Sequence, residues 1–145
     1  MKVSTRSRYG LKALLEIATE KDEKCVSLQS ISDKLGISVN YLEQIIAVLK
    51  KDGIVKSVRG AKGGYVLAKD MEEISFGEIL RSLEGDLYPV NCLNDEIEST
   101  KGSGCSCGES CSSECLTKET WTKLYNIITV SIDNISLKDI LEKNL

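Results

Sequence analysis

Apolar residues recur at helical spacing along residues 5–20, and four of them share one face. These are Leu11, Leu14, Leu15 and Ala18. Spacings of three and four residues predict an amphipathic helix, and Ser4 or Thr5 is suited to cap its start. We therefore expect the chain to open on a helix that packs by one side.

Two further helices are predicted around a short turn. Ser27 is suited to cap the segment LQSISDKL, which stops at Gly36. A third helix is expected over about residues 39–51, before an Asp-Gly pair that ends it. Two short helices around a tight turn that contains glycine form a helix-turn-helix.

The third helix has two different faces. Its inner positions are apolar: Val39, Leu42, Ile45, Ile46 and Leu49. The opposite positions are Asn40, Gln44, Ala47 and Lys51. Asn40 and Gln44 are of the types that pair with adenine edges in the major groove, and Lys51 is suited to a phosphate or guanine. Glu43, on the flank, either accepts from a cytosine amino group or is a solvated charge.

A glycine-rich hairpin is predicted after the third helix. Residues 54–58 and 65–68 alternate like strands and enclose the run RGAKGG, whose cations are Arg59 and Lys62. This pattern is typical of the wing of a winged helix, which lays an arginine into a minor groove. The alternative is a hairpin whose basic residues only keep a sheet edge soluble.

The second half of the chain predicts three more helices. Ser75 and Glu78 form a capping-box pattern that opens the helix FGEILRSLE, closed by Gly85. A long helix from Thr117 carries an apolar stripe made of Trp121, Leu124, Tyr125, Ile128, Ile132 and Ile135. A stripe of that length predicts pairing with an identical helix in a two-fold dimer, and the alternative is packing on its own winged helix. A second capping-box pattern, SLKD, precedes a short final helix.

The predicted fold class is mainly α with a small β-hairpin wing: a winged helix-turn-helix plus a long dimerisation helix. We divide the chain into a DNA-binding domain over residues 1–85, a cysteine-rich loop over 86–116 and a dimerisation region over 117–145.

The charge of the chain is unevenly distributed. Residues 1–70 hold 13 Lys and Arg against 8 Asp and Glu, and residues 71–145 hold 6 against 14. A basic half joined to an acidic half is typical of a nucleic-acid binder with a separate sensing or assembly region. Two solvated faces of unequal charge are the simpler alternative.

Five of the six cysteines lie in the second half of the chain. They are Cys92, Cys105, Cys107, Cys111 and Cys115. Their spacing in a polar stretch predicts a thiolate metal site holding zinc or an iron–sulfur cluster. Because the chain has no histidine, a Cys2His2 zinc module and a histidine-ligated cluster are excluded. Cys25 stands apart and is expected to be a packing residue.

Disulfides are the alternative to a metal, because six is an even number. The chain shows no secretory leader and no apolar stretch long enough to span a bilayer, so we expect a cytoplasmic protein without a membrane partner. A reducing compartment favours metal binding over disulfides. An enzyme and a small-molecule substrate are not expected, because the chain has no histidine base, phosphate cradle or nucleophile elbow.

Several motifs resemble one known family along essentially the whole chain. They are STRSRYGLKALLEIA, ISVNYLEQIIAVLKKDGIVKSVRGAKGGYVLAKD, FGEILRSLEG, CLTKETW and NISLKDIL. They are similar to the IscR/NsrR-type family of winged-helix transcription regulators. The resemblance implies a homodimer that binds palindromic promoter DNA and carries one iron–sulfur cluster per subunit.

The resemblance also implies roles for particular residues. By position, the DNA contacts would include Asn40, Glu43, Gln44 and Arg59, and we add Tyr41 of the YLEQ motif, Lys51 and Lys62 to this set. Cys92 and Cys115 match the first and last cysteines of the family. A 2Fe-2S cluster is expected, as in the IscR branch that controls cluster biogenesis. A nitric-oxide-sensitive 4Fe-4S cluster is the alternative, as in the NsrR branch.

The chain departs from the family pattern at two positions. Lys118 stands where IscR-type members often have a histidine, and Glu109 stands where a cysteine is usual. Cys105, Cys107 or Cys111 would then supply the remaining ligands. Another branch, without the cysteines, regulates cysteine metabolism through a protein partner, and the phrase RSLEGDLYPV resembles it. A DNA-binding protein with a structural zinc site is the further alternative.

Overall fold

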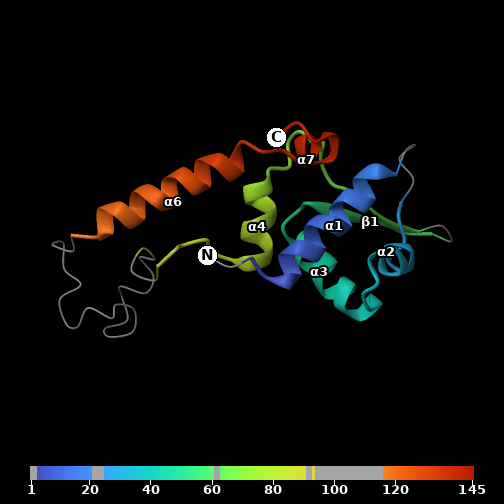
Figure 1. Ribbon diagram of the computed structural model, residues 1–145. Coiled ribbons are helices and arrows are strands. Elements are labelled where there is room, and N and C mark those ends of the chain that lie inside the picture. The colour runs from blue at the N-terminus through green and yellow to red at the C-terminus, as the bar shows by residue number, and fades with distance from the viewer. Residues whose placement is uncertain (1–2, 21–24, 61–62, 91–92, 94–115) are drawn as a thin grey trace.

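The computed structural model describes residues 3–20, 25–60, 63–90, 93 and 116–145 (Figure 1). Six helices and a two-stranded antiparallel hairpin lie within these ranges. In chain order they are α1 (Thr5–Thr19), α2 (Leu28–Leu35), α3 (Val39–Lys51), β1 (Val55–Val58), β2 (Gly64–Leu67), α4 (Phe76–Glu84), α6 (Lys118–Asp133) and α7 (Leu137–Glu142). The predicted fold class, mainly helical with a hairpin wing, is confirmed.

Serine side chains begin five of these helices. Each accepts a hydrogen bond from a backbone N–H of the first turn, which would otherwise lack a partner. The capping residues are Ser4, Ser27, Ser38, Ser75 and Ser136. Ser4, Ser27, Ser75 and Ser136 belong to capping patterns that the sequence predicts, and α1 to α4 begin within a residue of the predicted positions. Helix α7 begins at Leu137, within the SLKD pattern that was expected to precede it.

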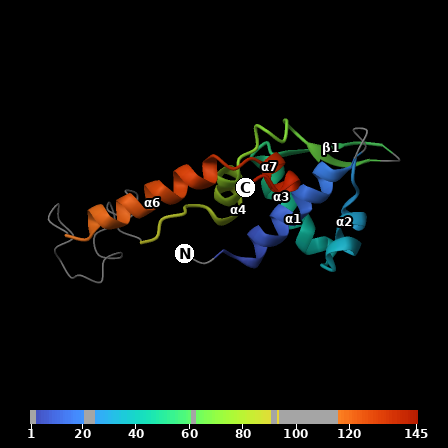
Figure 2. The same ribbon diagram turned by 45° about the horizontal axis from the view of Figure 1, so that its top comes forward.

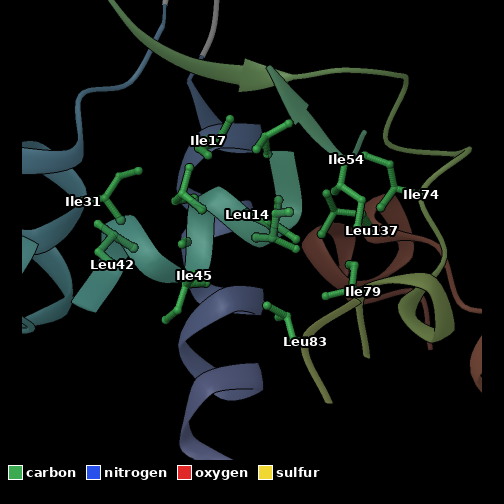
Figure 3. Close-up of a cluster of buried hydrophobic side chains, with 14 of the residues drawn as sticks. Leu14, Ile17, Ile31, Leu42, Ile45, Ile54, Ile74, Ile79, Leu83 and Leu137 are labelled. Atoms are coloured by element: carbon green, nitrogen blue, oxygen red, sulfur yellow. The ribbon is translucent and has the colours of Figure 1, made fainter. Parts of the chain in front are cut away.

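One apolar core joins the first four helices, the base of the hairpin and α7 (Figure 3). Leu14 of α1 and Ile45 of α3 are fully buried in it, beside Ile79 and Leu83 of α4. Leu137, the first residue of α7, is also fully buried there. The end of the chain therefore returns to the core that the N-terminal helices form.

The two strands of the hairpin differ in burial, since β2 is half-buried along its whole length. Val55 pairs with Leu67, and Val58 pairs with Gly64. Val55 is buried, whereas the other three residues of β1 are exposed. On its other side β2 pairs with Val26, whose N–H donates to the Tyr65 carbonyl at 3.0 Å and whose carbonyl accepts from the Tyr65 N–H at 2.9 Å. The hairpin is therefore fixed to the body through Val55 and through the outer edge of β2, while the rest of β1 stays exposed.

Helix α6 projects from the body on the side opposite to the hairpin (Figures 1 and 2). None of its residues is fully buried. Its C-terminal end is joined to α4, because Phe76 N–H donates to the Ile135 carbonyl at 2.7 Å and Leu137 N–H donates to the Ile74 carbonyl at 2.8 Å. The body and α6 are therefore connected through the start of α4.

The two capping-box predictions had different outcomes. At α7 the box is complete, since Ser136 Oγ accepts from Asp139 N–H and the Asp139 carboxylate accepts from Ser136 N–H at 2.9 Å. At α4 Ser75 Oγ accepts from Glu78 N–H at 3.0 Å, but the Glu78 carboxylate accepts from Lys69 Nζ at 2.6 Å. The Glu78 carboxylate therefore pairs with a lysine instead of accepting from the Ser75 N–H, as the capping-box pattern predicted it would.

Candidate nucleic-acid interface

The turn between α2 and α3 is held by Ser32. Gly36 ends α2 in the left-handed region, at φ 65°, which glycine adopts without a steric penalty. The N–H of Gly36 donates to the Ser32 carbonyl at 2.9 Å, and Ser32 Oγ donates to the Ile37 carbonyl at 2.6 Å. Ser38 then caps α3. The buried Ser32 hydroxyl, which was not singled out in the sequence, thus fixes the angle between the two helices.

The two faces of α3 lie as the sequence predicts. Leu42, Ile45, Ile46 and Leu49 are fully buried. The polar candidates on the other side are exposed: Asn40, Glu43, Gln44 and Lys51. Because the second helix of a helix-turn-helix is the one that enters the major groove, this exposed polar row is suited to contact base edges.

Tyr41 differs from the other candidates on α3. It is half-buried, and its ring meets that of Tyr9 of α1 edge to face, with 6.3 Å between centroids. Lys12 Nζ lies 5.6 Å from the centre of the Tyr9 ring. Nothing in the sequence indicates that α1 borders this face. The structure thus adds Tyr9 and the exposed Lys12 to the surroundings of the recognition helix.

The tip of the wing is described only in part. Arg59 is exposed at the end of β1, and Lys62 lies outside the described residues. Lys50 and Lys51, both exposed, supply two cations in the last turn of α3. Positive charge therefore borders the polar row of α3 within the first half of the chain, as phosphate contacts require.

The predicted apolar stripe of α6 is partly covered by the chain itself. Tyr88, in the segment after α4, stacks on Tyr125 with 4.7 Å between ring centroids. Trp121 and Leu124 are exposed, and so are Ile127 at 56% and Val130 at 61%, two residues that the predicted stripe did not include. An apolar surface of this kind on a helix is typical of a protein–protein contact.

The candidate metal ligands lie outside the described residues: Cys92, Cys105, Cys107, Cys111 and Cys115. Within the part of the chain that the structure describes, no three His, Cys, Asp or Glu side chains gather as a metal site. Cys25 is half-buried beside Val26. None of the described helices is both long and apolar enough to cross a lipid bilayer.

Comparison with known proteins agrees with this architecture. The family model Rrf2, described as an iron-dependent transcriptional regulator, matches residues 3–143. The HTH-type transcriptional regulator CymR of Bacillus subtilis is 36% identical over 97% of this chain and 89% of its own length. The regulator IscR of Serratia proteamaculans is 35% identical over 97% of this chain and 79% of its own length.

Solved structures of relatives superpose over nearly the whole chain. The structure described as CymR, the global cysteine regulator of B. subtilis, has a TM-score of 0.75 and 34% identity, and covers 99% of this chain and 98% of that one. The structure of T. potens IscR has a TM-score of 0.73 and 38% identity, and covers 100% and 89%. The expected resemblance is confirmed, and these homologues are regulators rather than enzymes. The chain belongs to the Rrf2 family of winged-helix, DNA-binding transcription regulators.

Proposed function

We propose that this regulator binds operator DNA as a homodimer and that an iron–sulfur cluster in its cysteine-rich segment, residues 92–115, controls the binding. The observation that carries the DNA-binding part is the exposed polar row of α3 in a helix-turn-helix with a wing. The cluster part rests on five thiols in a chain without histidine. Its partner would be promoter DNA, and its compartment would be the cytoplasm.

The DNA contacts are assigned by side-chain type and position. Asn40 and Gln44 would read base edges in the major groove, and Glu43 would accept from a cytosine amino group. Lys51 would contact the phosphate backbone, and Arg59 would enter a minor groove. We assign Tyr41 to holding the start of α3 through its ring contact with Tyr9, and Lys62 to the wing tip.

The homodimer is proposed from the apolar surface of α6. The exposed apolar side chains of α6 are Trp121, Leu124, Ile127 and Val130, which together cover about half of the helix circumference. A second copy of the same helix would bury this surface, and a two-fold pair would present two recognition helices to a palindromic site. A homodimer is also what the sequence resemblance implies.

A thiolate set fits an iron–sulfur cluster. Cys92 and Cys115 would be two ligands, with the others drawn from Cys105, Cys107 and Cys111. The segment after α4 runs alongside α6 toward the start of that helix (Figure 1), and Tyr88 stacks on Tyr125 in the middle of α6. The described residues on the two sides of the cysteine-rich segment thus lie at the same end of the molecule. A bound cluster would supply a redox-active centre. Its loss would change the conformation of the chain at that end of the molecule.

Regulation of cysteine metabolism is the second candidate. The observation that favours it is the similarity to CymR, at 36% identity, which is as high as the 35% and 36% identity to two IscR relatives. A structural zinc site and a nitric-oxide-sensing 4Fe-4S cluster are the remaining alternatives, because zinc and both cluster types accept thiolate ligands.

Metal analysis of anaerobically purified protein separates these candidates. We expect a coloured protein with equal amounts of iron and sulfide, and the ratio of iron to chain distinguishes a 2Fe-2S from a 4Fe-4S cluster. Cys92→Ala and Cys115→Ala should abolish the colour, whereas the control Cys25→Ala should retain it. Stoichiometric zinc without iron would leave the structural-zinc function, and protein without either metal would favour the cysteine-metabolism function.

A further inference from the structure

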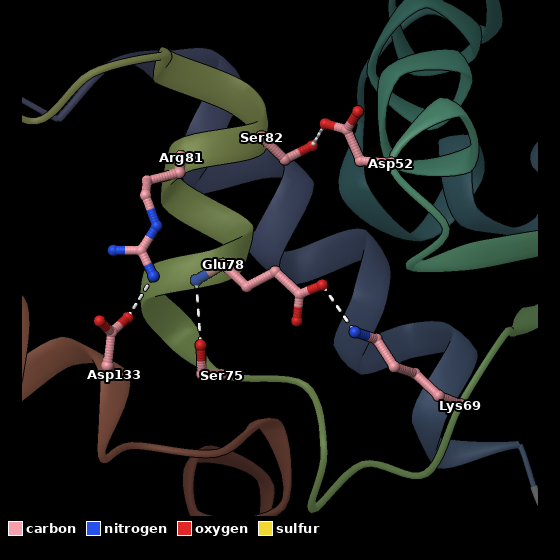
Figure 4. A network of polar contacts seen from close by, with 7 residues as sticks. All are labelled: Asp52, Lys69, Ser75, Glu78, Arg81, Ser82 and Asp133. Atoms are coloured by element: carbon pink, nitrogen blue, oxygen red, sulfur yellow. Dashed lines mark hydrogen bonds and ion pairs between the residues drawn. The ribbon is translucent and has the colours of Figure 1, made fainter.

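Helix α4 lies between the recognition helix α3 and the long helix α6, and it contacts both (Figure 4). Consecutive residues of α4 point to opposite sides. The Arg81 guanidinium pairs with the Asp133 carboxylate in the last turn of α6. Ser82 Oγ donates to Asp52 Oδ2, at the C-terminal end of α3, at 2.6 Å. The two helices are therefore joined through neighbouring residues of one short helix.

The contact between α4 and α6 depends on Gly77. A β-carbon at this position would lie 1.9 Å from Asp133 Oδ1 and 3.0 Å from the Arg81 guanidinium. The missing side chain therefore leaves the space in which the Asp133 carboxylate meets Arg81. A β-carbon at this position would force that carboxylate, or the helix that carries it, to move.

The other side of α4 is fixed to the DNA-binding body. Leu83 is buried in the core, next to Ile45 of α3 and Gly10 of α1. The Glu84 carboxylate accepts from the N–H of Ser4 at 2.7 Å, which fastens the end of α4 to the start of α1. Helix α4 therefore moves with α3, and the direction of α6 is set where it meets α4.

We propose that Arg81, Gly77 and Asp133 are positioning residues for operator recognition. They hold α6 at one angle to α3 and thereby set the separation of the two recognition helices in a dimer. This inference rests on the proposed function, because it requires two copies that pair through α6 and bind duplex DNA together. The junction of Arg81, Gly77 and Asp133 would thus determine which distance between the two half-sites the dimer prefers.

The geometry makes spacing sensitive to this junction. Helix α6 has 16 residues, which at 1.5 Å per residue is about 24 Å. A tilt of roughly 10° at one end displaces the other by roughly 4 Å, close to the rise of one base pair. The Arg81–Asp133 pair is 40% and 37% exposed, so it contributes little to folding stability. Its loss should alter the angle without unfolding the chain.

Asp133→Asn is the most direct variant, because it removes the ion pair while every cation that could contact DNA stays in place. Glu16→Gln is a matched control, since Glu16 pairs with Lys34 on the surface of the body, far from α6 in sequence and bonded to α2. Both variants lose one carboxylate. A difference between them therefore reports the junction rather than the net charge.

The test measures affinity for duplexes whose two half-sites are separated by different spacers. A site is first selected from random-sequence duplex DNA with the parent chain, and its spacer is then shortened and lengthened one base pair at a time. The parent and Glu16→Gln should prefer one spacer. For Asp133→Asn and Gly77→Ala the preference should shift by a base pair or weaken at least about fivefold, with unchanged sedimentation. Combining Arg81→Glu with Asp133→Arg should restore the parent's profile.

Variants at this junction that keep the parent's spacer profile would overturn the inference and leave the proposed function intact. A parent that selects no DNA, or that binds all spacers equally, would overturn the proposed dimeric recognition and this inference with it.

Discussion

Gly10 of α1 lies against Leu83 of α4 so closely that a β-carbon on Gly10 would stand 2.3 Å from Leu83 Cδ1. Ile45 of α3 is the next neighbour, at 3.3 Å. The absence of a side chain on Gly10 therefore allows α1, α3 and α4 to meet at one point of the core. This contact holds α3, the recognition helix, against α4, which in turn contacts α6.

Replacing Gly10 by Ala should destabilise the protein. Alanine is the better helix former by about 1 kcal/mol, but overfilling a packed core costs about 1–3 kcal/mol, and the overlap with Leu83 is severe. We expect a net loss of about 1–2 kcal/mol in urea unfolding. In a Leu83→Ala background the loss should shrink or reverse, because the clashing methyl group is gone. An equal loss in both backgrounds would show that Leu83 is not the cause.

The capping box of α7 should make stability depend on acid. Hydrogen bonds from the Ser136 hydroxyl and then from the Ser136 N–H hold the pKa of Asp139 below its ordinary value of 3.8. The unfolded state therefore takes up the proton first, so the contribution of Asp139 is present above pH 3.8 and is lost as the pH falls through the folded pKa.

Asp139→Asn tests this dependence. The variant should be less stable than the parent in urea unfolding near neutral pH, and the difference should shrink in acid. Glu142→Gln, which removes a carboxylate from the same helix, serves as the charge control. A difference between parent and Asp139→Asn that stays constant down to strongly acidic pH would contradict the role of the charged form.

The proposed dimer is tested at Ile127. Because this side chain is 56% exposed in the isolated chain, Ile127→Glu should leave the fold of one subunit stable. A buried, unpaired charge in the interface should instead shift sedimentation toward monomer and lower DNA affinity. Thr122→Glu, at an exposed position on the side of the same helix away from Leu124 and Ile127, should sediment like the parent. If both variants remain dimeric, the interface lies elsewhere.

The sequence predicts the helices well because their signals are local. Ser27, Gly36 and Ser38 bound α2 and the turn by contacts within a few residues, and the apolar spacing of α3 sets its buried face. These signals place the exposed polar row correctly. They also identify the family, whose motifs run along the whole chain.

The contacts that join the elements could not be predicted in this way. Tyr9 and Tyr41 meet across 32 positions of the chain, and Arg81 reaches Asp133 across 52. No periodicity within one helix indicates which residue of another helix lies opposite. The same reason explains Glu78, which binds Lys69 rather than completing its cap. The division into residues 1–85, 86–116 and 117–145 stays a prediction. Leu137, which belongs to the last of these ranges, lies in the same core as the N-terminal helices.

Sequence-specific DNA binding through the exposed row of α3 is the central claim, and Gln44→Ala tests it most directly. Affinity should be measured at several salt concentrations for the selected duplex and for a scrambled duplex of equal length. We expect the variant to lose about 1–3 kcal/mol on the selected duplex, with relaxed preference at one position, and to bind the scrambled duplex like the parent. Equal affinity of variant and parent for the selected duplex at every salt concentration would contradict the assignment of this face to base recognition.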